Sequence, residues 1–103
     1  MDIYWLAHSC FRLKGKQATI VTDPFVSLGP DDPWPQPTAQ ILTVSHNHPG
    51  HNNIDGVDGK PRILSGPGEY EVAGIFILAF GSFHDADSGK QLGRNIIHLF
   101  DMD

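Results

Sequence analysis

Three histidines fall within six residues of this sequence, directly after a short apolar run. They are His46, His48 and His51 in the stretch SHNHPGHNN, and they are half of the six histidines in the chain. Neutral imidazole is the usual nitrogen ligand of zinc and similar divalent ions. His46 and His48 are two residues apart, so in an extended segment they project to the same side. His51 can return to that region if the chain turns at the intervening Pro-Gly pair. The spacing predicts a metal site, and its alternatives are a solvated polar loop or the remains of a disused site.

Three other residues carry chemistry that the sequence leaves open. Asp23 can accept a hydrogen bond from the free ring N–H of a ligand histidine, or it can cap a turn before Pro24. Cys10 has no evident paired base, so it is expected to be a small buried residue rather than a nucleophile. His98 alternates with apolar neighbours and is expected to be packed rather than metal-bound.

Short strands and turns must position these residues. The run ILTV, residues 41–44, is bounded by turn signals and predicts a buried strand that leads into the histidines. Residues 24–37 hold five prolines and predict an irregular loop. In GEYEV, Tyr70 and Val72 are expected on one face of a strand and the two glutamates on the other. We expect about seven short strands, drawn from segments 3–7, 10–14, 18–22, 41–44, 61–65, 66–74, 75–80 and 95–100.

Helical patterns are nearly missing from the sequence. No window of ten or more residues has an apolar stripe of helical period, and only a short helical turn fits between His51 and Gly56. Segments 75–80 and 95–100 are apolar on both faces and therefore need cover on both sides. The sheets must pack on each other as a sandwich, or a second chain must cover the open face. We expect a contribution from a second chain.

Length and composition narrow the class of protein. The 103 residues allow one domain, and the apolar fraction of 40% is that of a globular protein. The net charge of −5 and the seven scattered basic residues argue against nucleic acid and anionic membranes as partners. No apolar run has the length of a membrane span. The sequence begins without a signal peptide and has one cysteine, so a cytoplasmic location is expected.

Several segments together resemble the metallo-β-lactamase superfamily. They are WLAHSCFRL, TDP at 22–24, ILTVSHNHPGHNN, SGPGEYEVAG, FHD at 83–85 and NIIHLFDMD. Within that superfamily the sequence is similar to metal-dependent hydrolases related to ascorbate-phosphate lactonase. The resemblance implies an α/β fold, the αββα sandwich, of which residues 1–103 would be the strand-dominated N-terminal half. It also implies hydrolysis by water that a divalent metal activates, with zinc expected and manganese as the alternative.

The resemblance assigns ligands residue by residue. His46 and His48 match the first two ligands of the first metal, and His84 matches its third. His51 matches a ligand of the second metal. The aspartate of the family motif His-x-His-x-Asp-His falls at position 50, where this chain has Gly50.

The second metal site is therefore incomplete in this sequence. The family's bridging aspartate and a further histidine lie beyond the segment that NIIHLFDMD matches, so two-metal catalysis from this chain alone is not expected. Asp85 could orient His84 or approach a metal. His8 lies in a segment that the family places near the active site, and it could contact substrate or make an ordinary hydrogen bond.

Three functions remain open at this point, and the catalytic residue is not identified. The chain could be a hydrolase of lactones, esters or phosphoesters that needs a second chain to be complete. It could be a metal-binding module without catalysis. It could also be a vestigial, truncated half-domain that self-associates. The family fold has two similar halves, so a homo-oligomer is expected, and a symmetric dimer is the favoured form.

Overall fold

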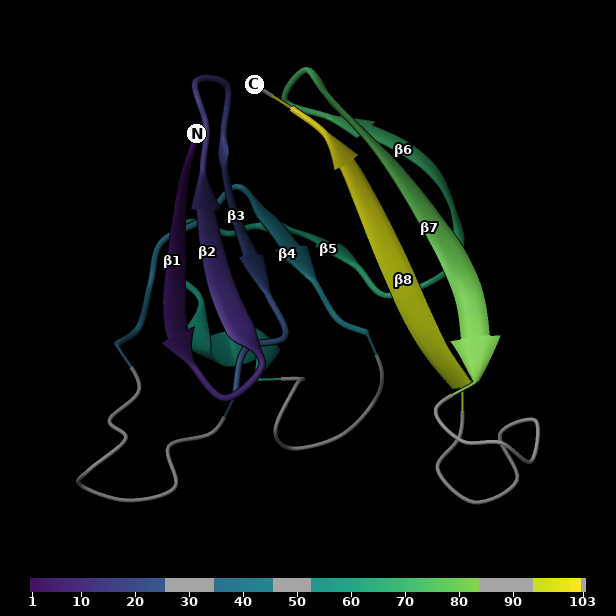
Figure 1. The fold of residues 1–103 in the computed structure, drawn as a ribbon. Coiled ribbons are helices and arrows are strands. Elements are labelled where there is room, and N and C mark those ends of the chain that lie inside the picture. The colour runs from purple at the N-terminus through teal and green to yellow at the C-terminus, as the bar shows by residue number, and fades with distance from the viewer. Residues whose placement is uncertain (26–34, 46–52, 84–93, 103) are drawn as a thin grey trace.

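The computed structural model describes residues 1–25, 35–45, 53–83 and 94–102. In this part of the chain it contains eight strands and one turn of 3₁₀ helix, η1 at Ile54–Gly56. The strands form a five-stranded sheet, ordered β1-β2-β3-β4-β5, and a three-stranded sheet, ordered β6-β7-β8 (Figure 1). The strands are β1 Asp2–Ala7, β2 Cys10–Lys14, β3 Thr19–Thr22, β4 Ile41–Thr43, β5 Arg62–Leu64, β6 Gly68–Val72, β7 Ile75–Phe83 and β8 Arg94–Asp101.

The five-stranded sheet changes from antiparallel to parallel pairing along its width. The strands β1, β2 and β3 pair antiparallel, whereas β3, β4 and β5 pair parallel. Successive side chains point to opposite faces, so Ile20 and Val21 of β3 enter different clusters. On the outer face Val21 packs with Cys10, Phe25, Ala39, Leu42 and Val57.

The three-stranded sheet supplies the other half of the core. Ile75 and Ile77 of β7 are fully buried and pack with Ile20 and Ile41 of the first sheet. Tyr70 and Val72 join this cluster, whereas Glu69 and Glu71 are exposed, so the predicted alternation along β6 is confirmed. The Tyr70 hydroxyl also donates a hydrogen bond to the carbonyl of Gly66 at 2.8 Å, which closes the turn before β6.

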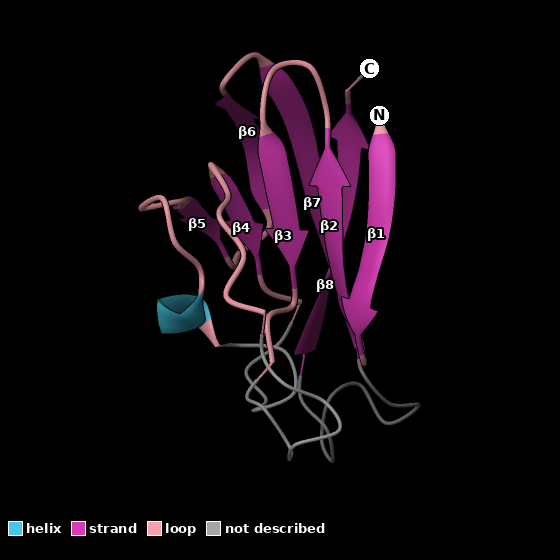
Figure 2. Cartoon of the chain, turned by 90° about the vertical axis from the view of Figure 1, so that its left-hand side faces the viewer, coloured by secondary structure: helices cyan, strands magenta, loops and turns pink. Residues whose placement is uncertain are grey.

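The two sheets stack as the layers of a sandwich (Figure 2). The expected strand-dominated half of the metallo-hydrolase sandwich is therefore confirmed, with eight strands and no α-helix among the described residues. The strand β7 continues to Phe83, three residues beyond the apolar run 75–80, because these residues pair with the start of β8. The short helical turn expected before Gly56 is also present. None of the described helices is long and apolar enough to cross a membrane.

Candidate metal centre

The four strands that precede predicted site residues in the sequence all end on one side of the sandwich. The strands β1, β3, β4 and β7 all run toward the lower end in Figure 1. His8 follows the last residue of β1, Asp23 follows β3, and His84 follows β7. His46 comes three residues after the end of β4. The fold therefore brings the attachment points of these residues to a single rim, which we call the strand-end rim.

The predicted metal ligands themselves lie outside the described residues. This holds for His46, His48, His51 and His84, and also for Asp85. The structure does describe the residues that flank them, and it shows how the two histidine-bearing segments begin and end. Within the described part of the chain, no three histidine, cysteine or acidic side chains are grouped to hold a metal ion.

One hydrogen bond joins the flanks of the two histidine-bearing segments. The backbone N–H of Ile96, near the start of β8, donates to the carbonyl of Ser45 at 2.7 Å. Ser45 directly precedes His46 in the sequence. The neighbouring end of β7 pairs Phe83 with Arg94, two residues before Ile96. The segment with His46 and the segment with His84 therefore leave the described structure from adjoining points on the rim.

Asp23 fixes the chain at the point where the histidine segment starts. One carboxylate oxygen accepts the backbone N–H of Ser45 at 2.6 Å, and the other accepts the Ser45 hydroxyl at 2.9 Å. The backbone N–H of Asp23 donates to the carbonyl of Thr43 at 2.8 Å. Its φ of 46° lies in the left-handed region, which aspartate tolerates better than most residues. Both side-chain bonds are long-range, to a residue 22 positions away, and they anchor Ser45. The two roles that the sequence left open for Asp23, a turn cap and a partner of a ligand histidine, stay predictions.

The other end of the histidine segment is attached to the same place. The backbone N–H of Asn53 donates to the carbonyl of Pro24 at 2.8 Å, and its side-chain amide donates to the carbonyl of Phe25 at 2.9 Å. Phe25 is fully buried in the outer core cluster. Ser45 and Asn53, the described residues on either side of 46–52, are consequently both attached to residues 23–25 after β3. Sequence reasoning had not singled out Ser45 and Asn53, although small polar residues that flank a histidine run are typical turn anchors.

His8 lies at the same rim, beside one of these anchors. Its ring meets the edge of Phe25 at a centroid distance of 4.7 Å and an interplanar angle of 71°. Its φ of 50° is also in the left-handed region, at the turn between β1 and β2. His8 is exposed, so its imidazole is accessible at the rim.

The charge of Asp23 acts on two titratable groups in the adjoining interior. Burial, with the nearby Asp23 charge, raises the pKa of the Cys10 thiol to about 12. Cys10 is therefore a neutral, buried thiol, as its sequence context predicted, and it is a poor nucleophile. Burial lowers the pKa of His98, and the negative charge of Asp23 partly offsets this because it favours the protonated imidazole. His98 stacks on Phe100 with ring centroids 6.2 Å apart, which confirms the expected packed histidine.

The chain matches a known family and two longer relatives. The family described as β-lactamase superfamily domain matches residues 2–103. A "UPF0173 metal-dependent hydrolase" of Ruegeria pomeroyi is 33% identical over 81 residues, which are 74% of this chain and 35% of that protein. The crystal structure of a "putative Zn-dependent hydrolase of the metallo-β-lactamase superfamily" from Thermotoga maritima is 39% identical, with a TM-score of 0.74.

The structural match covers nearly the whole chain. It includes 98% of this chain and 44% of the Thermotoga maritima chain, so this chain spans less than half the length of either relative. The two-layer sandwich, the single rim at its strand ends and the family match over residues 2–103 agree with one another. This chain belongs to the metallo-β-lactamase superfamily.

Proposed function

We propose that this chain is a metal-dependent hydrolase component in which His46, His48 and His84 hold one divalent ion. Zinc is the proposed ion, and manganese is the alternative. The observation that carries the proposal is the 2.7 Å hydrogen bond from the Ile96 N–H to the Ser45 carbonyl. It ties the strand that follows the His84 segment to the residue that precedes His46, so the described residues that flank the two histidine-bearing segments lie next to each other.

The donor set suits such an ion. Three neutral imidazoles leave one position of a tetrahedral zinc open, which is the arrangement of a catalytic rather than a structural site. When bound, the metal supplies a water of lowered pKa near neutral pH. The names of the two relatives, which refer to metal and to zinc, support this choice.

The protein's own residues would orient the site. Asp23 holds Ser45, and Asn53 is held by the carbonyls of Pro24 and Phe25, so both residues that flank the histidine segment are fixed to the same part of the chain. His51 is the proposed ligand of a second metal, whose aspartate ligand is replaced by Gly50. His8 and Asp85 are the proposed neighbours of the ligands, in contact with substrate or with a ligand ring.

The proposed substrates are small molecules with a lactone, ester or phosphoester bond. This follows the likeness to hydrolases related to ascorbate-phosphate lactonase. The single cysteine is consistent with a cytoplasmic enzyme. Because the chain spans less than half of its relatives, the proposal includes a further polypeptide surface that completes the active site.

Gly50 favours a second candidate function. A glycine has no side-chain donor at the position where the family motif has an aspartate, so the second metal would lack a ligand. The alternative is a one-metal module that binds its ion without catalysis.

Metal content measured together with hydrolysis distinguishes the two candidates. We expect native mass spectrometry with zinc or manganese to find one ion per chain, and we expect His48→Ala and His84→Ala each to remove it. His98→Phe is the matched control, since His98 is packed on Phe100 and should leave the ion in place. Hydrolysis of a model lactone or phosphodiester that stops with His48→Ala supports the enzyme. A bound ion without hydrolysis supports the module, and no bound ion contradicts both.

A further inference from the structure

Each sheet of the sandwich ends in an open strand on the same side of the molecule. The strand β1 is the edge of the five-stranded sheet, and β8 is the edge of the three-stranded sheet. Figure 2 places both at the side where the N- and C-terminal ends of the chain lie close together, and Figure 1 agrees. No described strand pairs with the outer edge of either one. Open strand edges are templates for pairing with another chain.

The five-stranded sheet extends beyond the sheet that covers its inner face. Ile3 is opposite Leu13, which is in turn opposite Ile20, so all three share the face that packs against β7. Whereas Ile20 is fully buried, Ile3 is 61% exposed. Trp5 and Phe11, a cross-strand pair on the same face, are 66% and 39% exposed. The inner core thus continues onto β1 and β2, where none of the described strands forms a second layer above it.

Trp5 is held in place although it is exposed. Its indole N–H donates to the carbonyl of His8 at 2.8 Å, so the polar atom is satisfied within its own turn. The rest of the ring presents apolar surface in a fixed orientation. Rigid, exposed tryptophans of this kind are frequent anchors of protein interfaces.

The outer edge of β8 is occupied by the chain itself only near the start of the strand, where the N–H of Ile96 points away from β7 and donates to the carbonyl of Ser45. Since backbone groups alternate in direction along an antiparallel strand, those of His98 and Phe100 point to the same open edge.

We propose that this side is the interface between two copies of the chain. In this dimer β1 of each copy pairs with β8 of the other, around a two-fold axis parallel to the strands. In Figure 1 β1 and β8 run in opposite directions, and an axis parallel to the strands preserves that relation, so the new pairs are antiparallel. A six-residue strand such as β1 gives a ladder of about 20 Å, and the symmetry forms it twice.

The dimer joins the sheets of the two copies into two continuous layers. Each layer contains the five-stranded sheet of one copy and the three-stranded sheet of the other. Trp5 and Ile3 then meet the same residues of the second copy at the axis, and the exposed inner face becomes interior. The two open edges of one copy are matched by the two open edges of an identical copy, which is the self-complementarity that a two-fold dimer requires. This selects a second copy as the occupant.

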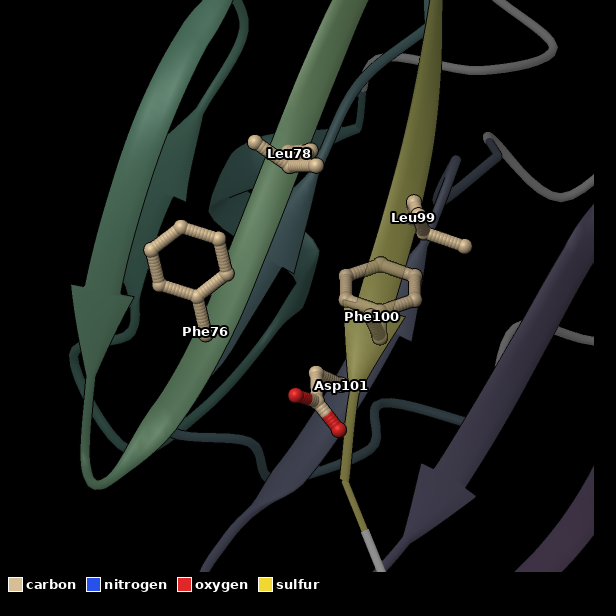
Figure 3. Close-up of a pocket in the computed structure, with 5 residues that line it drawn as sticks. All are labelled: Phe76, Leu78, Leu99, Phe100 and Asp101. Carbon is tan, nitrogen blue, oxygen red and sulfur yellow. The ribbon is translucent and has the colours of Figure 1, made fainter.

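The molecule's other apolar surface is less suited to self-association. It lies on the outer face of β7 and β8, where Phe76, Leu78, Leu99 and Asp101 line a groove of about 400 Å³ that also reaches the inward-facing Phe100 (Figure 3). Phe76 lies between Glu71 and Asp101 in one cross-strand row, so carboxylates border this face on both sides. Two such faces in contact would bring like charges together in a chain with a net charge of −5.

Subunit counting tests the interface, and the result does not depend on metal binding. We expect native mass spectrometry and light scattering over a dilution series to find two chains per particle. We expect Trp5→Asp to give monomers. Leu99→Asp is the matched control, because Leu99 is 56% exposed on the outer face of β8, and it should leave the dimer intact. A monomeric wild-type chain, or a dimer that survives Trp5→Asp or is lost with Leu99→Asp, overturns the proposal.

Amide hydrogen exchange tests the strand pairing itself. The amides of His98 and Phe100 should exchange slowly in the dimer and quickly in the Trp5→Asp monomer. The amide of Leu99 points toward β7 and should stay protected in both, which shows that the variant remains folded. If Trp5→Asp loses protection at Leu99 as well, Ile3→Asp replaces it as the deciding variant. Equal exchange of the His98 and Phe100 amides in dimer and folded monomer contradicts pairing along β8.

Discussion

At the scale of single residues, Asp23 links the core strands to the histidine segment. Sequence reasoning left two roles open for it, a turn cap and a partner of a ligand histidine. The structure shows a further role, because both carboxylate oxygens accept hydrogen bonds from Ser45, 22 residues away. A carboxylate oxygen has two acceptor positions, so the two earlier roles are compatible with these contacts and stay predictions.

Asp23→Ala should destabilise the protein and loosen the start of the histidine segment. Hydrogen bonds to a charged group each contribute about 1.5–3 kcal/mol, so we expect the free energy of unfolding in urea to fall by about 2–4 kcal/mol. Ser45→Ala removes only the hydroxyl and should cost about 1 kcal/mol. An Asp23→Ala protein as stable as the Ser45→Ala protein would contradict the anchoring role. If the anchor also orients the ligands, zinc affinity should fall in the same order.

Cys10 gives a pH-dependent prediction. Its folded pKa of about 12 lies above the ordinary thiol value of 9.0, so between these pH values the unfolded chain loses a proton that the folded chain keeps. The free energy of unfolding should therefore fall as the pH rises above about 9. Cys10→Ala should flatten this dependence in urea titrations. Iodoacetamide should label the wild-type thiol at pH 8 only after unfolding, and rapid labelling of the native protein would contradict the burial.

At the scale of elements, the sequence predicted the strand β7 but not which of its two faces is buried. Its apolar run predicted a strand with two apolar faces, and the structure buries only one of them in the described sandwich. Ile77 is fully buried, whereas Phe80 on the opposite face is 50% exposed. Periodicity gives the alternation of faces, but it does not say which face meets another layer.

Ile77→Ala and Phe80→Ala therefore form a matched pair on one strand. Removing Ile77 leaves a cavity between the sheets and should cost about 2–5 kcal/mol. Removing the half-exposed Phe80 should cost clearly less, although it deletes a larger side chain. Chemical unfolding at one fixed chain concentration measures both values. Equal losses would mean that the outer face of β7 is also buried in the native protein.

At the scale of the whole molecule, the strand-end rim connects the fold to the proposed metal centre. A ligand that binds the native state alone adds stability that grows with the logarithm of its concentration, about 2.7 kcal/mol at one hundred times its dissociation constant. Zinc should therefore raise the unfolding midpoint, and a chelator should reverse the effect. His48→Ala should abolish the shift while unfolding like the wild type without metal. If the unfolding midpoint of the wild-type chain does not change when zinc is added, the proposed centre is contradicted.

The amino-acid sequence by itself determined the local features of this protein. It placed the strands near their observed positions, because turn residues and alternating apolar side chains mark strand limits directly. It also identified the buried Cys10 and the packed His98. The family resemblance supplied the sandwich, which the match over residues 2–103 and the solved relative support.

The features that depend on pairing between distant segments were decided only by the tertiary structure. The hydrogen bond between Ile96 and Ser45 joins residues 51 positions apart, and no local pattern marks either one. The attachment of Asn53 to Phe25, and the exposure of Trp5 at an uncovered edge, likewise depend on which strands become neighbours. Pairing order is set by the sum of packing over the whole core, whereas periodicity reports one segment at a time. For this reason the histidine spacing could suggest a metal site, but only the fold could bring its flanking residues to one rim.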